Sequence, residues 1–151
     1  MRFFKLLSLF FSIALLFIFL YSYNRVFPKK IPKPFADLQI NDIEKIILKS
    51  EGKITEIFKK ENRWYIVRDA DEFTADEKRI GSIIENIQSL QKEDVVSNNK
   101  TKRDEFEIDK RIIEIKTPKK IFTLYIGINH TSDANYVSAN DENDIFLASG
   151  F

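Results

Sequence analysis

The chain of 151 residues contains no cysteine. It therefore cannot form a disulfide, use a thiolate as a nucleophile or hold a metal through cysteine. Histidine is almost as scarce, because His130 is the single one, and most nucleophilic triads and metal sites rely on histidine or cysteine. The composition thus removes the commonest catalytic centres before any motif is considered.

Acidic residues are absent from residues 1–36, which contain six bases and so have a net charge of +6. The other 115 residues hold the remaining 18 bases and all 23 acids, which gives this body a net charge of −5. An acidic body without a basic face argues against a nucleic-acid partner, because such binding depends largely on neutralising phosphates. About 115 residues suffice for one domain with its own core.

A long uncharged stretch runs from Leu6 to Tyr23 and contains neither glycine nor proline. As a helix, these residues would measure about 27 Å, which nearly crosses the hydrocarbon core of a bilayer. A cleaved signal peptide is the alternative, but Tyr21 to Asn24 offer no A-x-A-like site. A buried helix of a soluble core is disfavoured because the stretch is apolar on all sides. We therefore expect an uncleaved transmembrane signal anchor that contacts the lipid bilayer through Leu6 to Tyr23.

The flanking charges and the layout of this segment favour opposite orientations. Lysine and arginine are more numerous on its C-terminal flank, which by the positive-inside rule places the body in the cytoplasm. A short basic region, an apolar region and a following domain are instead the layout of a signal anchor that exports its C-terminal domain. We expect a single-pass protein of the cell (inner) membrane with an extracytoplasmic, periplasmic body.

Three segments of the chain are predicted: a transmembrane signal anchor over residues 1–24, a Pro/Lys-rich spacer over residues 25–36, and an α+β extracytoplasmic domain over residues 37–151. Val26 to Phe35 contains three of the four prolines. Proline fixes φ and cannot donate a ladder hydrogen bond, which favours a semi-rigid extended spacer. A ligand for a proline-recognition domain is the alternative.

Alternating apolar residues predict strands in the body. Asp42 to Ser50 and Lys53 to Lys60, separated by Glu51-Gly52, have the pattern of a hairpin, and Arg63 to Arg68 follows as a third strand with a buried Trp64. Further strands are expected over Gln91 to Ser97, Arg111 to Thr117, Lys120 to Gly127, Asn135 to Ala139 and Asp144 to Ala148. The short links predict antiparallel meanders before and after one helix.

The expected helix carries Ile80, Ile83, Ile84, Ile87 and Leu90 at the spacing of one buried face. Thr74 and Glu77 match a capping box, so the helix should begin near Ala75. Gly81 inside it costs about 1 kcal/mol relative to alanine. The predicted fold class is α+β: antiparallel β-meanders packed on one amphipathic helix and preceded by a single transmembrane helix.

Two acidic stretches are candidates for a metal. Asp69, Asp71 and Glu72 lie close together, but no second cluster of ligands supports them and such runs are usually solvated loops. Asp141 to Asp144 suggests calcium, yet it lacks the glycine and distal glutamate of an EF-hand, and a hairpin turn explains it. We expect no metal, no cofactor-binding residue and no cofactor.

His130, Ser132 and Asp133 are the candidates for a catalytic triad, in a polar loop between strands. Proximity in sequence does not place these three groups within hydrogen-bond reach, and an exposed histidine is commonplace in such a loop. Carboxylate pairs could hydrolyse glycosides, but with 23 acids a pair arises by chance. We therefore expect no catalytic residue and no enzyme.

The order of features resembles the bacterial domain of unknown function DUF4340. The resemblance is carried by weak motifs in sequence order: Trp64, Ala75-Asp76, the spaced aliphatics from Ile80 to Leu90, Val95-Val96-Ser97, Phe106-Glu107-Ile108-Asp109, Ile126-Gly127, Tyr136-Val137 and Ile145-Phe146-Leu147. Glu107 departs from the family, which usually has glycine there, and this puts a tight turn in doubt. The resemblance implies an accessory role beside ABC-type export permeases of the gliding-motility class and supplies no catalytic residue.

The expected function is that of a membrane-anchored, non-catalytic accessory domain, with a membrane protein such as a transporter subunit as partner and no nucleic acid. Contact would use a sheet edge or the polar helix face formed by Glu77, Lys78, Glu85 and Gln88. The alternative is a small exported β-rich module that binds or passes lipid or glycan between membrane components.

Overall fold

The computed structural model describes residues 12–19, 31–68, 70–92, 94–131, 134–140 and 142–149. The chain divides into two units, Met1–Ile31 and Pro32–Phe151. In the first unit, residues 12–19 are helical. The strands and helices discussed below belong to the second unit.

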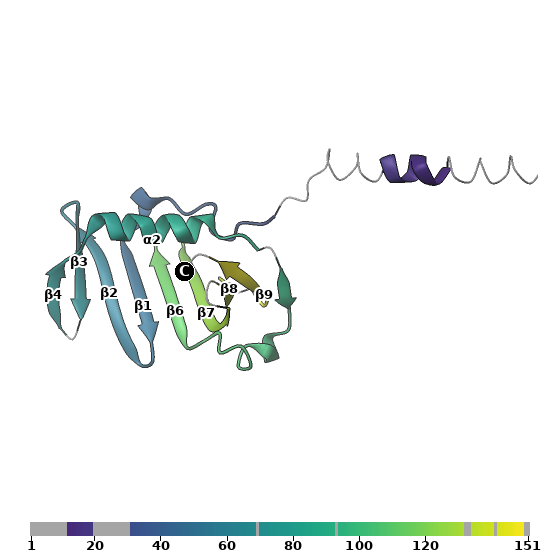
Figure 1. Cartoon of the computed structure of the whole chain (residues 1–151). Helices are drawn as coiled ribbons and strands as arrows, with labels where there is room; N and C mark the ends of the chain where they lie inside the picture. The colour runs from purple at the N-terminus through teal and green to yellow at the C-terminus, as the bar shows by residue number, and fades with distance from the viewer. Residues whose placement is uncertain are drawn as a thin grey trace, which may run out of the picture. The chain divides into compact units, whose positions relative to one another are not determined.

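The described residues of the second unit form strands, one α-helix and two 3-10 turns (Figure 1). The strands are β1 (Lys45–Ser50), β2 (Lys53–Lys60), β3 (Arg63–Arg68), β4 (Asp71–Thr74), β5 (Val95–Ser97), β6 (Arg111–Lys116), β7 (Ile121–Thr131), β8 (Ala134–Ala139) and β9 (Ile145–Ser149). The α-helix is α2 (Glu77–Ser89), and the 3-10 turns are η1 (Ile40–Asp42) and η2 (Lys100–Lys102).

All nine of these strands form one antiparallel sheet in the order β4-β3-β2-β1-β6-β7-β8-β9-β5. The predicted hairpins β1–β2 and β6–β7 are confirmed by their registers. They are joined by the pairing of β1 with β6, which places Ile46 between Ile57 and Ile115. Backbone hydrogen bonds between β1 and β6 therefore join the strands that precede α2 in the sequence to those that follow it.

The predicted fold class is wrong as a description of the chain. The described residues form mainly one continuous nine-stranded sheet, not separate meanders. No helix among the described residues is long and apolar enough to cross a membrane, so the predicted transmembrane helix and the inner-membrane address are corrected as well. Of the predicted span from Leu6 to Tyr23, residues 12–19 are described as helix, and the rest lies outside the described residues.

Helix α2 begins later than the capping box predicts. Thr74 is part of β4, opposite Tyr65, and Asp76 caps the helix instead. Its Oδ1 accepts hydrogen bonds from the backbone N–H groups of Lys78 and Arg79, at 3.0 and 3.3 Å. A carboxylate at this position satisfies free donors and interacts favourably with the helix dipole. The acidic stretch before the helix, expected to be a loop, supplies the edge strand β4.

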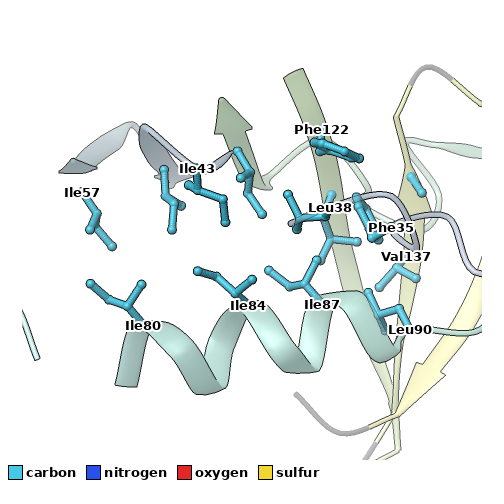
Figure 2. Packing of buried hydrophobic residues seen from close by; sticks show 14 of the residues in the cluster. Phe35, Leu38, Ile43, Ile57, Ile80, Ile84, Ile87, Leu90, Phe122 and Val137 are labelled. Atoms are coloured by element: carbon cyan, nitrogen blue, oxygen red, sulfur yellow. The ribbon is translucent and has the colours of Figure 1, made fainter. Parts of the chain in front are cut away.

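The core lies between α2 and one face of the sheet. Ile80, Ile84 and Ile87 are at most 4% exposed and point toward the strands (Figure 2). Trp64, as predicted, is buried on this face. The chain before β1 completes the core, because Phe35, which we assigned to the spacer, and Leu38 are fully buried.

Two glycines provide a matched test of this packing. A Cβ at Gly81 would meet only Ile40 Cδ1, at 4.0 Å, whereas a Cβ at Gly127 would lie 2.3 Å from the Phe106 carbonyl oxygen. We expect Gly81→Ala to raise the free energy of unfolding by about 0.5–1 kcal/mol, because alanine restricts the unfolded chain and favours helix. Gly127→Ala should lower it by about 1–3 kcal/mol, because the backbone must move apart.

Urea unfolding followed by circular dichroism measures both changes. Equal effects of the two substitutions would show that the close approach at Gly127 is absent.

Candidate interaction surface

His130 lies within β7, where we expected a loop. It is exposed, and its Nδ1 lies 2.7 Å from the Tyr136 hydroxyl, with the two rings edge to face at 5.2 Å. Ser132 and Asp133 lie outside the described residues. The structure therefore brings the predicted histidine to a phenol on the neighbouring strand.

Two of the acidic candidates are separated by the strand that carries them. Asp71 and Glu72 are consecutive in β4, so their side chains lie on opposite faces of the sheet. Asp69 lies outside the described residues. Among the residues that the structure describes, no group of three or more His, Cys, Asp or Glu side chains could hold a metal ion.

The other acidic candidates, Glu142 and Asp144, both bind the Lys92 ammonium; Asp141 lies outside the described residues. Burial lowers the pKa of Lys92, but the hydrogen bonds and charges of the two carboxylates outweigh it and hold the pKa above its usual value. A raised pKa means that this contact stabilises the fold below the unfolded-state pKa and is lost only as the pH rises through the folded-state value. Lys92 thus ties the chain after α2 to the turn before β9 at neutral pH.

Arg103, which sequence analysis missed, is the centre of a second polar cluster. Its Nε and Nη2 donate to the two carboxylate oxygens of Asp109, and Nη1 donates to the Ser138 hydroxyl at 3.1 Å. The guanidinium also lies 4.5 Å from the centre of the Tyr125 ring. Ser138 is fully buried and donates to the Glu142 carbonyl oxygen. The cluster fastens residues 98–110 to the sheet.

Glu107 and Gly127 explain two motifs of the family resemblance. Glu107 has φ +53°, so the turn forms although glycine is absent. It lets the Phe106 carbonyl oxygen accept from Ile128 N–H at 2.9 Å, beside Gly127, where a side chain would not fit. These residues hold the loop before β6 against β7.

A hollow of about 430 Å³ lies beside Arg103. Its lining mixes Lys100, Tyr125 and Asn140 with the carboxylates of Asp104, Asp109 and Glu142. Asp109 and Glu142 already have cationic partners. The hollow is polar, open and nearly balanced in charge.

The sheet face turned away from α2 pairs its own charges. Lys45 contacts Glu56 at 2.7 Å, and Lys49 contacts Glu114. Phe58 and Tyr65 stack on each other on this face, with ring centres 5.8 Å apart. Such cross-strand pairs are typical of a face that is stable in water.

The helix-bearing face is only partly covered. Leu48, Ile66, Ile113 and Ile126 pack against the core but remain half-buried. Leu48, Ile113 and Ile126 lie further along the sheet than the row of Ile46 and Ile115 under α2, beyond the flank of the helix that carries Ile83, which is 44% exposed. Ile66 lies in that row, beside Ile57. Gly81, on the opposite flank, faces Ile40. One flank of the helix thus faces the segment before β1, which contains Ile40. The other flank lies beside half-buried apolar residues of the sheet that α2 does not cover.

Three bases border these apolar residues. Lys53, Arg68 and Arg111 alternate in their strands with Ile57, Ile66 and Ile113, so they share the helix-bearing face. No ion pair of these three side chains occurs among the described residues, although Arg111 donates to the Gly127 carbonyl oxygen. We call the seven residues Leu48, Ile66, Ile113, Ile126, Lys53, Arg68 and Arg111 the basic strip.

The polar helix face proposed from the sequence is divided. Glu77, Lys78 and Glu85 are exposed and available for contact. Gln88 is half-buried, and its Nε2 donates to the Leu38 carbonyl oxygen, which fixes the chain before β1. It serves the fold.

The strain at Glu107 is testable. Glu107→Gly should raise the free energy of unfolding by about 0.5–1 kcal/mol, because glycine adopts positive φ at low cost and the lost ion pair with Lys110 is exposed. Glu107→Ala removes the same ion pair but keeps Cβ, and should give no gain. Thermal unfolding of both variants separates the two effects; a gain for alanine would refute the backbone explanation.

Comparison with known proteins adds one match. The family model for a domain of unknown function (DUF4340) matches residues 64–151, more than half of the chain. No curated protein and no solved structure matches. The matched residues run from Trp64 in β3 through α2 and the Arg103 cluster to the end of the sheet, in agreement with the motifs that suggested the resemblance. The chain therefore belongs to the DUF4340 family.

Proposed function

We propose that the chain is a non-catalytic interaction domain that binds a partner protein through the part of the sheet that α2 leaves bare. The contacts of the polar residues support this proposal. Arg103, Lys92 and His130 all contact other side chains of the fold. Among the described residues, no buried polar side-chain atom lacks a hydrogen-bond partner. A buried polar atom without a partner would point to a bound ligand or a catalytic role.

The observation that carries the proposal is the incomplete cover of the sheet. Helix α2 is about 10 Å wide with its side chains, whereas the six residues of β1 or of β6 extend over about 20 Å along the strand. One helix cannot cover that face. Leu48, Ile66, Ile113 and Ile126 consequently stay half-buried on it. Burying such residues against a partner supplies free energy of association.

The family resemblance implies a subunit of an ABC-type transport or gliding-type assembly as the partner. In this proposal, the partner binds at the uncovered apolar residues of the helix-bearing face. Cross-linking from that face can identify the partner.

A second candidate function is the binding of a glycan in the hollow beside Arg103. Tyr125, Asn140 and the carboxylates that line it are residue types that contact sugars. The Arg103 guanidinium, however, already lies on the Tyr125 ring. We prefer the interaction domain for this reason.

Site-specific cross-linking tests the proposal, and the absence of cysteine makes a single introduced thiol unambiguous. Ser50→Cys places a photoreactive label at the exposed end of β1, on the helix-bearing face. Ile54→Cys places the same label on the adjacent strand but on the opposite face, where Ile54 is 57% exposed. In the cells that produce the protein, we expect one discrete adduct from position 50 and at least fivefold less of it from position 54.

Mass spectrometry of the adduct identifies the partner. An adduct from α2 or from the edge strands β4 and β5, without one from position 50, would refute the bare face as the contact surface. No discrete protein adduct from any of these positions would refute the interaction domain itself. Replacing Asn140 with alanine addresses the second candidate, because a sugar-binding hollow would lose affinity while the adduct from position 50 would persist.

A further inference from the structure

We infer that the basic strip binds an acidic amphipathic segment of the partner, about three to four helical turns long. This inference rests on the proposed function and deepens it, because it names the surface and the chemistry of the segment that occupies it.

The apolar floor sets the size of the segment. Ile66 lies on β3, Leu48 on β1, Ile113 on β6 and Ile126 on β7, and the sheet order between them is β3-β2-β1-β6-β7. Five strands about 4.8 Å apart span about 19 Å. A helix rising about 1.5 Å per residue covers that distance with about 13 residues. The exposed flank of α2 with Ile83 forms one wall, so a helix laid alongside would bury its apolar stripe against both.

The bases set the charge of the segment. Lys53, Arg68 and Arg111 border the floor, and among the described residues two acids lie beside them: Asp71, opposite Arg68 in β4, and Glu51, in the turn before Lys53. Three bases against these two acids leave a border that is net positive on a body whose net charge is −5. The opposite face, by contrast, neutralises Lys45 with Glu56 and Lys49 with Glu114. A segment with carboxylates along its outer edge complements the strip, and a basic segment is repelled by it.

The two faces of β2 and β3 supply a matched pair of variants. Lys53 and Arg68 are exposed on the helix-bearing face. Lys60 and Arg63 are exposed on the same two strands, face each other across the pair, and point to the opposite face. Each double substitution to serine, K53S/R68S or K60S/R63S, removes two positive charges from exposed positions, so both variants should fold like the parent chain.

Selection from a display library of random 15-residue peptides on the full chain tests the inference. We expect enriched peptides to carry aliphatic residues at i, i+3, i+4 and i+7 and an excess of Asp and Glu. A synthetic peptide of the enriched sequence should bind about tenfold more weakly to K53S/R68S and less than twofold more weakly to K60S/R63S. Its affinity should fall as salt is raised.

Basic or uncharged peptides, equal losses in the two variants, or no enrichment would each overturn the inference. Self-association of the chain that K53S/R68S abolishes would also overturn it, because a second copy would then be the occupant. Failure here is distinguishable from failure of the proposed function. A discrete cross-link from α2, β4 or β5 would retain an interaction domain with another contact surface, whereas no adduct from any position would remove both.

Discussion

The packing of one apolar helix stripe on one face of the sheet is the contact on which the rest of the structure depends. Ile80, Ile84 and Ile87 are buried, and each contributes about 1.5–3 kcal/mol relative to exposure. This contact fixes α2 over the strands and, with Phe35 and Leu38, closes the core on one flank of the helix (Figure 2). Because α2 is a single helix of 13 residues, it also determines which part of the sheet stays bare. The packing of α2 on the sheet thus stabilises the fold and also determines which apolar residues stay accessible to a partner.

The charged residues Arg103 and Lys92 hold irregular segments of the chain on this sheet. Arg103 joins residues 98–110 to β7 and β8 through Tyr125 and Ser138, and Lys92 joins the chain after α2 to the turn before β9. A charged group that is partly buried needs such partners to offset its desolvation. These clusters lie within residues 64–151, the region that the DUF4340 model matches.

Local patterns predicted the local structure well. Alternation identified the hairpin β1–β2, and the spacing of the aliphatic residues identified Ile80, Ile84, Ile87 and Leu90 as buried. Ile83, predicted on the same face, is 44% exposed. The pairing of β1 with β6 joins residues far apart in the sequence, which no local pattern reveals. The strand β4 was missed because its acidic residues resemble a loop, and Arg103 was missed because it lies in a run of charges whose tertiary partners decide its role.

The apolar composition of Leu6 to Tyr23 indicated a membrane span, and no helix in the described part of the chain is long and apolar enough for one. The basic strip depends on side chains from several strands, so only the sheet order brings it together.

Thiol reactivity at two neighbouring positions of β6 tests most directly whether part of the helix-bearing face is bare. Ile113 and Ile115 point to the same face, but Ile115 is 1% exposed under the cover of α2 and Ile113 is half-buried beyond it. In the folded chain, the thiol of Ile113→Cys should react with a maleimide at least tenfold faster than that of Ile115→Cys, measured below the unfolding transition of each variant. Equal protection of the two thiols would show that the strip is covered within the chain itself, and the account of this protein as a partner-binding sheet would be wrong.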